Sequence, residues 1–181
     1  MPNSMTARDE ERRQEHRPGA VLYVYTWDLI LVILALLVTL APFAGAVQSS
    51  SGAQPLPFYA QVIEAVSSAA FAATLIILAA LLTRRYAWVR IVQIGTLVTH
   101  ITLAIISEIV LAISGNSAGV PGLLGTLLFV LLDGLAILIM TDRRVVTWYD
   151  QRAAIPVYAW AVLVLWVGGS ALNIVLDAVY H

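Results

Sequence analysis

Five ionisable or amide side chains lie inside long apolar stretches, where they could bind or relay an ion or a proton: Glu64, His100, Glu108, Asp133 and Asn173. An ionisable group at the centre of a bilayer costs about 2.5–3.5 kcal/mol on insertion scales, so it is a functional candidate by default. The alternative is that these groups form hydrogen bonds between helices and select which helix faces pair. Helix pairing is the simpler interpretation for Glu64, Asp133 and Asn173 taken singly. The two interpretations weigh equally for His100 and Glu108.

The stretch 88–113 carries the clearest polar pattern. In a helix with about 100° of rotation per residue, one arc of its surface holds Gln93, Thr96, His100, Ser107 and Glu108. Polar faces in lipid turn toward the interior of a helix bundle, so this arc predicts a polar interior.

Two neighbouring stretches repeat the pattern on a smaller scale. One side of 58–82 holds Glu64, Ser67, Ser68 and Thr74, and one stripe of 121–141 holds Gly122, Thr126 and Asp133. We expect these three stretches to meet along their polar stripes. In a proton or ion path, Glu64, Glu108 and Asn173 would form the outer mouth. His100 would lie in the middle, with Asp133 and Asp28 leading inward. Asp28 and Asp177 lie near the ends of their own apolar stretches, where we expect water to solvate them.

Small residues predict where helices approach each other closely. Ala65, Ala69 and Ala73 form a ridge on one side of 58–82, and the run "GGS" at 168–170 is typical of tight helix packing.

The composition indicates a membrane protein. Of the 181 residues, 60% are hydrophobic and 12% are charged, whereas soluble domains carry about 25% charged residues. The chain has no cysteine, which excludes disulfides, iron–sulfur clusters and thiolate zinc sites. The net charge of −1 gives no reason to expect a nucleic-acid partner.

Five stretches are long enough to cross a bilayer, which takes about 20 mostly apolar residues. They are 23–43, 58–82, 88–113, 121–141 and 156–180. The sequence therefore predicts an all-α polytopic bundle of five transmembrane helices, preceded by a charged tail, 1–22, that we expect to be disordered.

All ten positive residues are arginines, and they cluster in three places. Four lie in the tail (Arg8, Arg12, Arg13 and Arg17), three follow the second stretch (Arg84, Arg85 and Arg90), and three follow the fourth (Arg143, Arg144 and Arg152). Positive residues in short loops stay on the cytoplasmic side. Five spans with a cytoplasmic N-terminus in the cell membrane place all ten on that side.

The ends of the stretches suggest contacts with lipid. We expect Arg84, Arg85, Arg143 and Arg144 to contact anionic lipid head groups. An inner aromatic belt is predicted from Tyr23, Tyr25, Trp27, Tyr86, Trp88, Trp148, Tyr149, Tyr158 and Trp160.

Two alternatives concern the organisation of the chain. The charged start, the first apolar stretch and "AGA" at 44–46 could form a cleavable signal peptide, although uncleaved anchoring is the preferred interpretation. The arginine pair and tryptophan that close both the second and fourth stretches suggest tandem hairpins, 58–113 and 121–180. Convergence on the same signals at the membrane surface would explain the match equally well.

No motif specifies a reaction, so we expect no catalytic residues, no cofactor and no metal site. A b-type haem held within one chain needs two histidines at depth, and only His100 qualifies. The first functional interpretation is a non-enzymatic accessory or scaffold subunit, in contact with membrane lipids and assembled as a homo-oligomer or within a larger membrane-protein complex. The alternative is a small proton- or ion-coupled transporter or channel that uses the polar stripe of 88–113. An enzyme acting on lipids has no supporting motif.

Overall fold

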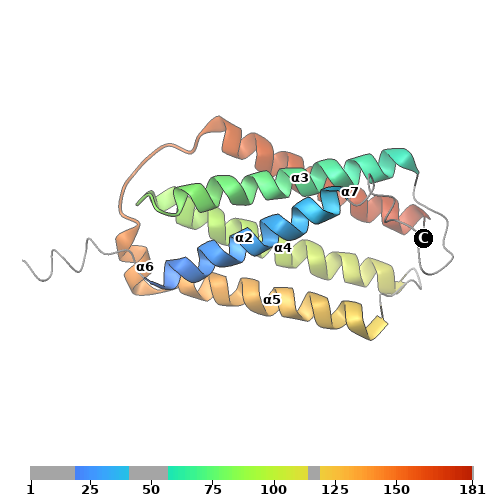
Figure 1. Ribbon diagram of the computed structural model, residues 1–181, viewed down its shortest axis with the longest axis horizontal. Helices are drawn as coiled ribbons and strands as arrows, with labels where there is room; N and C mark the ends of the chain where they lie inside the picture. Colours follow the sequence, from blue (N-terminus) through green and yellow to red (C-terminus); the bar gives the residue numbers. More distant parts are fainter. Residues whose placement is uncertain (1–18, 41–56, 114–118, 181) are drawn as a thin grey trace, which may run out of the picture.

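The computed structural model describes residues 19–40, 57–113 and 119–180. Within these ranges the chain is helical (Figure 1), with the order α2 (Ala20–Leu40), α3 (Phe58–Leu81), α4 (Ala87–Ile113), α5 (Gly119–Thr141), α6 (Arg143–Trp148) and α7 (Val157–Tyr180). All but the short α6 are long and apolar enough to cross a membrane.

The five predicted apolar stretches are confirmed as five long helices. Their ends agree with the predicted ends to within three residues. The first helix begins at Ala20 rather than at Tyr23, and its predicted end at 41–43 lies outside the described residues. Residues 1–18 of the predicted tail, with four of the ten arginines, also lie outside them. The tandem duplication stays a prediction.

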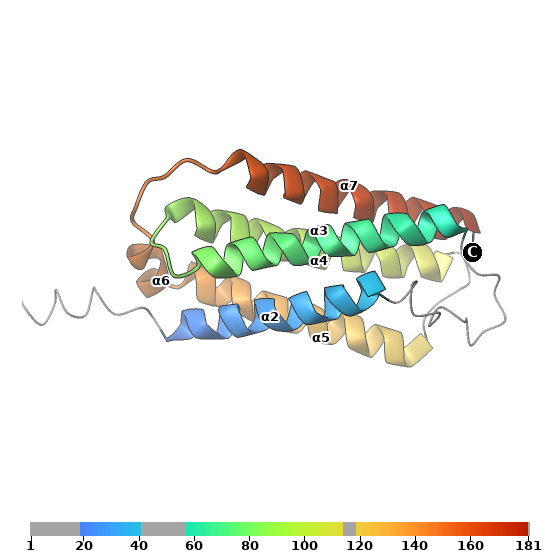
Figure 2. The same cartoon turned by 45° about the horizontal axis from the view of Figure 1, so that its top comes forward.

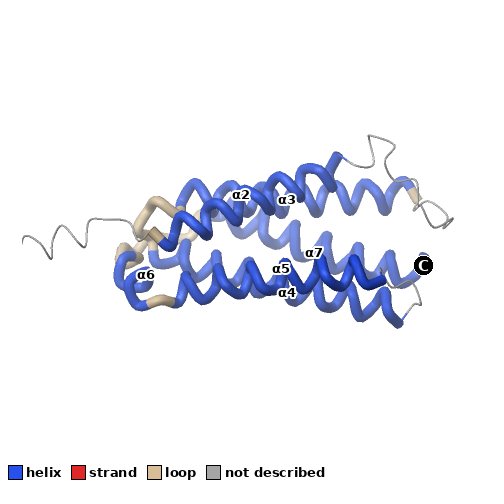
Figure 3. The backbone as a smooth tube through the Cα atoms, turned by 60° about the horizontal axis from the view of Figure 1, so that its bottom comes forward, coloured by secondary structure: helices blue, strands red, loops and turns tan. Residues whose placement is uncertain are grey.

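The five long helices form a ring around a shared interior. α3 packs along both α2 and α7, α7 also contacts α4, α4 packs on α5, and α5 returns to α2. Figure 2 shows α7 on one side of the bundle and α2 and α5 on the other, and Figure 3 shows α2 and α3 on one side and α4 and α5 on the other. α3 and α4 make little direct contact. Of the three stretches expected to meet along their polar stripes, 88–113 and 121–141 pack directly as α4 and α5, whereas α3 makes little direct contact with either.

Small residues let α3 and α7 come close together. Ser67 on α3 forms a hydrogen bond to Ser170 at 2.9 Å between their Oγ atoms, and its Oγ also lies 3.3 Å from the carbonyl oxygen of Trp166. A Cβ added to Gly169 would lie 2.9 Å from the Cβ of Ser67, closer than such atoms approach in real structures. Tight packing predicted from "GGS" at 168–170 is therefore confirmed.

The two arginine-bearing connectors lie at the same end of the bundle and are joined to each other. Tyr86 and Gln151 form a parallel bridge, with backbone bonds from Ala87 N to Gln151 O at 3.0 Å and from Gln151 N to Arg85 O at 2.9 Å. The phenol of Tyr149 donates to the carbonyl oxygen of Leu82 at 3.0 Å. The described arginines therefore gather at one end, where α6 also lies (Figure 1).

The predicted aromatic belt is only partly present at this end. Trp27, Trp88, Trp148 and Tyr149 are buried among other side chains, whereas Tyr158 and Trp160 are exposed. The first four belong to the hydrophobic core. Indole and phenol rings serve equally well in a core, so residue type alone does not separate the two environments.

Candidate functional site

A buried carboxylate at the middle of the bundle joins three helices. Asp133 on α5 is fully buried. Its Oδ1 accepts a hydrogen bond from Nε1 of Trp27 on α2 at 2.6 Å, and its Oδ2 lies 2.7 Å from Nδ1 of His100 on α4. Both carboxylate oxygens are therefore satisfied without water. With Nδ1 facing the carboxylate, Nε2 is the His100 atom free to exchange a proton or bind a ligand.

Aromatic rings hold the imidazole of His100 in place. Phe71 on α3 stacks against His100 with ring centroids 4.9 Å apart, and its ring also stacks on Trp166 of α7 at 4.7 Å. Phe129 on α5 meets His100 edge-on at 6.2 Å. Such contacts fix the plane of the ring, so the helices position His100 before any ligand arrives.

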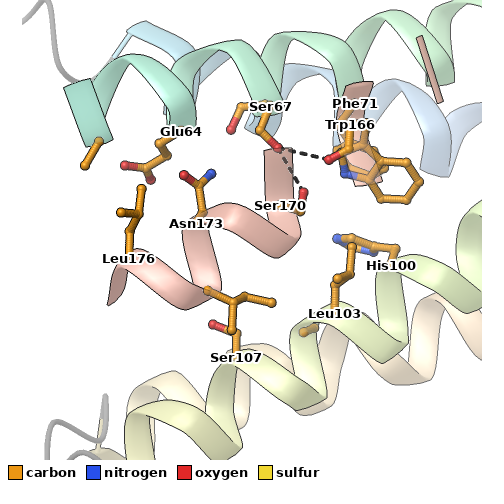
Figure 4. A pocket seen from close by; sticks show the side chains of 14 residues that line it. Glu64, Ser67, Phe71, His100, Leu103, Ser107, Trp166, Ser170, Asn173 and Leu176 are labelled. Carbon is orange, nitrogen blue, oxygen red and sulfur yellow. Dashed lines mark hydrogen bonds between the residues drawn. The ribbon is translucent and has the colours of Figure 1, made fainter. Parts of the chain in front are cut away.

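A cavity of about 360 Å³ lies among α3, α4 and α7. Its polar lining consists of Glu64, Ser67, Ser68, His100, Ser107, Ser170 and Asn173. Figure 4 shows Glu64 and Asn173 toward one end of the cavity, with His100, Phe71 and Trp166 at the other. The cavity therefore runs from the middle of the bundle toward the end opposite the arginines. Its volume lies within the range of about 300–1,000 Å³ that is usual for small-molecule sites.

A smaller and more apolar cavity lies on the other side of the aromatic stack. It measures about 190 Å³ and is lined by Leu31, Leu34, Ala35, Val38, Ser68, Phe71, His100 and Phe129. His100, Phe71 and Ser68 line both cavities, so they form the partition between them.

Toward the arginine-rich end the interior is closed by packed side chains. Leu75, Leu78 and Leu82 of the α3 segment, Leu97 of α4 and Met140 of α5 are all buried. Every buried residue of α4 lies in its first eleven positions, and every buried residue of α5 lies in its second half. The bundle is therefore tightly packed at one end and hollow toward the other.

Within this packed end lies a second buried carboxyl group. Asp28 on α2 accepts a hydrogen bond at its Oδ1 from Nε2 of Gln93 on α4, at 2.8 Å. Both residues are fully buried. Asp28 Oδ2, Gln93 Oε1 and the hydroxyl of nearby Thr96 have no hydrogen-bond partner within the described part of the chain. The expectation that water would solvate Asp28 is therefore wrong, because Asp28 is fully buried and its carboxyl group meets Gln93 of α4.

The five residues singled out from the sequence separate into two groups. Glu64, His100 and Asn173 line the larger cavity, and Asp133 holds His100 from behind. Glu108 does not line either cavity, and its Oε1 instead accepts a hydrogen bond from Thr126 of α5 at 2.8 Å. Glu108 therefore joins α4 to α5 rather than forming part of the mouth.

The arginines expected to contact lipid also differ from one another. Arg84, Arg143 and Arg144 have exposed side chains. Arg85 is half-buried, and its guanidinium binds Asp150 at 2.9 Å and the carbonyl oxygen of Trp148 at 3.2 Å. Contacts within the protein thus engage much of the Arg85 guanidinium, which leaves less of it for a lipid head group.

Phe71, Phe129 and Trp166 were not singled out from the sequence, and Trp27 was predicted for the aromatic belt rather than for the site. Each is aromatic within an apolar helix, where lipid-facing, interfacial and core positions share the same residue types. In the ranges that the structure describes, no group of three or more metal-binding side chains comes together. Comparison with protein-family models, with curated proteins and with solved structures finds no match for this chain.

Proposed function

We propose that this protein is a small transporter of the cell membrane, which binds a small polar solute in the cavity among α3, α4 and α7. The observation that carries the proposal is a polar cavity with His100 at its inner end, held by the fully buried Asp133. Ionisable groups are costly inside a membrane, and they commonly mark solute paths and proton relays. An accessory subunit needs no such cavity, so the geometry favours transport over the accessory role.

The proposed orientation places the arginine-rich end in the cytoplasm. The arginines of both described connectors lie at this end, and arginines in short loops are retained on the cytoplasmic side. The cavity then leads from the middle of the bundle toward the outer side. We also propose that α2 is retained in the mature protein, since Trp27 and Asp28 of α2 bind groups on α5 and α4.

The lining of the cavity favours a solute that is neutral or positively charged. Glu64 supplies a carboxyl group, Asn173 an amide, and four serines supply hydroxyls, whereas neither arginine nor lysine lines the cavity. Phe71 and Trp166 close the inner end of the cavity, where the ring of Phe71 stacks on both His100 and Trp166. A small amine fits this combination.

Access of water to the cavity is tested by thiol labelling, because the chain contains no native cysteine. In vesicles, Ser107→Cys should react with a membrane-impermeant cationic methanethiosulfonate faster than with an anionic one. Ile109→Cys is the matched control, since Ile109 lies two residues from Ser107 on α4 but on its exposed face. We expect at least tenfold slower labelling there, because lipid surrounds that position. Adding Glu64→Gln to Ser107→Cys should reduce the preference for the cationic reagent.

Transport is tested in vesicles with radiolabelled ethanolamine, choline and serine as probes. We expect uptake of at least one of them above that of protein-free vesicles, and loss of that uptake in Glu64→Gln and His100→Gln at equal protein content. Glu108→Gln is the control that should keep the uptake, because Glu108 lies outside the cavity. Failure of uptake for all three probes, together with failure of Ser107→Cys to react, would overturn the proposal in favour of an accessory role.

A further inference from the structure

Asp28 and Gln93 are joined by one hydrogen bond, yet each keeps an unsatisfied oxygen. The bond from Gln93 Nε2 to Asp28 Oδ1 is 2.8 Å long and joins the amide to the carboxyl group. Asp28 Oδ2 and Gln93 Oε1 are both buried without a partner in the described residues. A buried acceptor without a donor is rare in native proteins, so two on one bonded pair call for a physical explanation.

One added proton satisfies both oxygens. An ionised carboxylate and an amide oxygen are both acceptors, and two acceptors cannot bond to each other. A carboxylic acid has an O–H donor, which the amide oxygen can accept. The acid and the amide then exchange two hydrogen bonds in a ring, one of which the structure already shows between Gln93 and Asp28.

The charges buried in the bundle lead to the same conclusion. Asp28 and Asp133 are both 0% exposed. His100 lies against Asp133, whereas the partner of Asp28 is a neutral amide, and in the described residues no ion pair reaches Asp28. An unpaired buried carboxylate is costly enough that such groups usually take up a proton.

The surroundings of Asp28 include few groups that could supply a compensating charge. On α2 itself the phenol of Tyr23 bonds to Leu132 O, and on α5 the nearest titratable group is Asp133, whose charge would oppose a second one. On α4, His100 is taken by Asp133, and Arg90 bonds to the carbonyl oxygen of Met140 at 3.4 Å. The charged residue of α3 is Glu64, which lines the cavity toward the other end.

We propose that Asp28 and Gln93 form a proton-binding site. In this site Oδ2 of Asp28 carries a proton, and the resulting O–H donates a hydrogen bond to Oε1 of Gln93. Trp27, the residue before Asp28, bonds directly to Asp133, so this site adjoins the His100–Asp133 pair. The proposal deepens the proposed function and rests on it in one respect, since it names the proton as the coupling ion. Occupancy of the site by a proton can be measured without any transport.

Infrared spectroscopy of the purified full-length protein tests the site, because the carbonyl stretch of a protonated carboxyl group is separate from that of a carboxylate and shifts in D₂O. At neutral pH we expect a carboxylic-acid band in the native protein that is lost in Asp28→Asn. Asp133→Asn, Glu64→Gln and Glu108→Gln are matched controls, each of which removes a different carboxyl group and should keep that band. Gln93→Leu should shift the band to higher frequency, because it removes the acceptor of the proton.

Thermal stability provides a second readout. The amide of Asp28→Asn can donate to Gln93 Oε1 as the proposed acid does, so this variant should unfold within about 3 °C of the native protein, whereas Asp28→Leu should unfold at a clearly lower temperature. Acid bands that are unchanged in Asp28→Asn would overturn the proposal. Stabilisation of the native protein by Na⁺, absent in Asp28→Asn, would also overturn it and assign the three unsatisfied oxygens of Asp28, Gln93 and Thr96 to a metal cation. Failure of the native protein to take up any of the three probes, together with failure of Ser107→Cys to react, would refute the transport proposal, and an intact Asp28 band would leave the proton site standing.

Discussion

Trp27 and Asp133 lie 106 positions apart in the chain, yet Nε1 of the Trp27 indole lies 2.6 Å from Oδ1 of Asp133. His100 binds the other oxygen of the same carboxylate at 2.7 Å. Trp27 therefore donates to the carboxylate oxygen of Asp133 that the imidazole does not reach. This hydrogen bond joins α2 to α5 at the middle of the bundle. The orientation of His100 toward the cavity depends on a carboxylate that is held from both sides.

Replacement of Trp27 by phenylalanine should destabilise the protein. Trp27→Phe keeps an aromatic ring but removes the donor to a fully buried oxygen, and leaving such a group unsatisfied costs about 1–3 kcal/mol. Thermal unfolding in detergent measures the change. Trp160→Phe removes the same atoms from α7 at a position that is 50% exposed, so it should leave the unfolding temperature nearly unchanged. Equal unfolding temperatures for the two variants would contradict this account of Trp27.

Replacement of two adjacent glycines on α7 by alanine should affect the stability of the protein differently. In Gly169→Ala the new Cβ would lie 2.9 Å from the Cβ and 3.4 Å from the Cα of Ser67, so α3 and α7 must move apart. Overpacking of this kind typically costs about 1–3 kcal/mol. Gly168→Ala meets nothing within 4 Å, so its unfolding temperature should stay the same or rise.

A compensating change shows whether the clash is the cause. Ser67→Gly in the background of Gly169→Ala removes Cβ and Oγ, the two atoms closest to the new Cβ, so it should recover part of the lost stability although it also removes the hydrogen bond to Ser170. No recovery would mean that Gly169 acts through something other than its approach to α3.

The helices were predictable because each is an apolar stretch of about 20 residues or more, the length that crossing a bilayer requires. The stripe on α4 was also predictable, since Gln93, Thr96 and His100 do face the interior. The burial of Asp28 was not predictable from the sequence. Buried residues on α2 recur at Val21, Val24, Asp28, Leu31 and Ala35, but its exposed positions are equally apolar. In lipid both faces of a helix are hydrophobic, so the usual contrast between core and surface disappears.

Which helices are neighbours in the bundle could not be predicted from the sequence either. Glu108 lies on the same predicted arc as His100, yet it faces Thr126 on α5 while His100 lines the cavity. Ser107 and Glu108 are separated by about 100° around the helix axis, so the predicted arc that holds both of them faces two neighbouring helices. Which neighbour each residue meets depends on helix order around the ring, and nothing in the individual stretches encodes it.

Glu108 and Thr126 should show energetic coupling that does not affect the cavity. A double-mutant cycle with Glu108→Ala and Thr126→Val measures their interaction, and polar contacts between membrane helices average about 0.6 kcal/mol in such cycles. Uptake of the amine probes should be retained in each variant that assembles, because neither residue lines the cavity. A strictly additive cycle would show that the 2.8 Å contact adds no stability. Loss of uptake without loss of assembly would place Glu108 in the transport path.

The side of the membrane on which the two arginine-bearing connectors lie can be read from single cysteines. Thr83 and Thr147 are exposed and lie beside the Arg84–Arg85 and Arg143–Arg144 pairs, so Thr83→Cys and Thr147→Cys leave every arginine in place. Guanidinium groups resist crossing hydrocarbon, so both cysteines should be protected in intact cells from an impermeant maleimide and should react after permeabilisation. Val120→Cys, at the exposed start of α5 at the other end of the bundle, should react in intact cells. Reaction of Thr83→Cys and Thr147→Cys from opposite sides would contradict the joining of Tyr86 to Gln151, and with it the ring of five helices around His100.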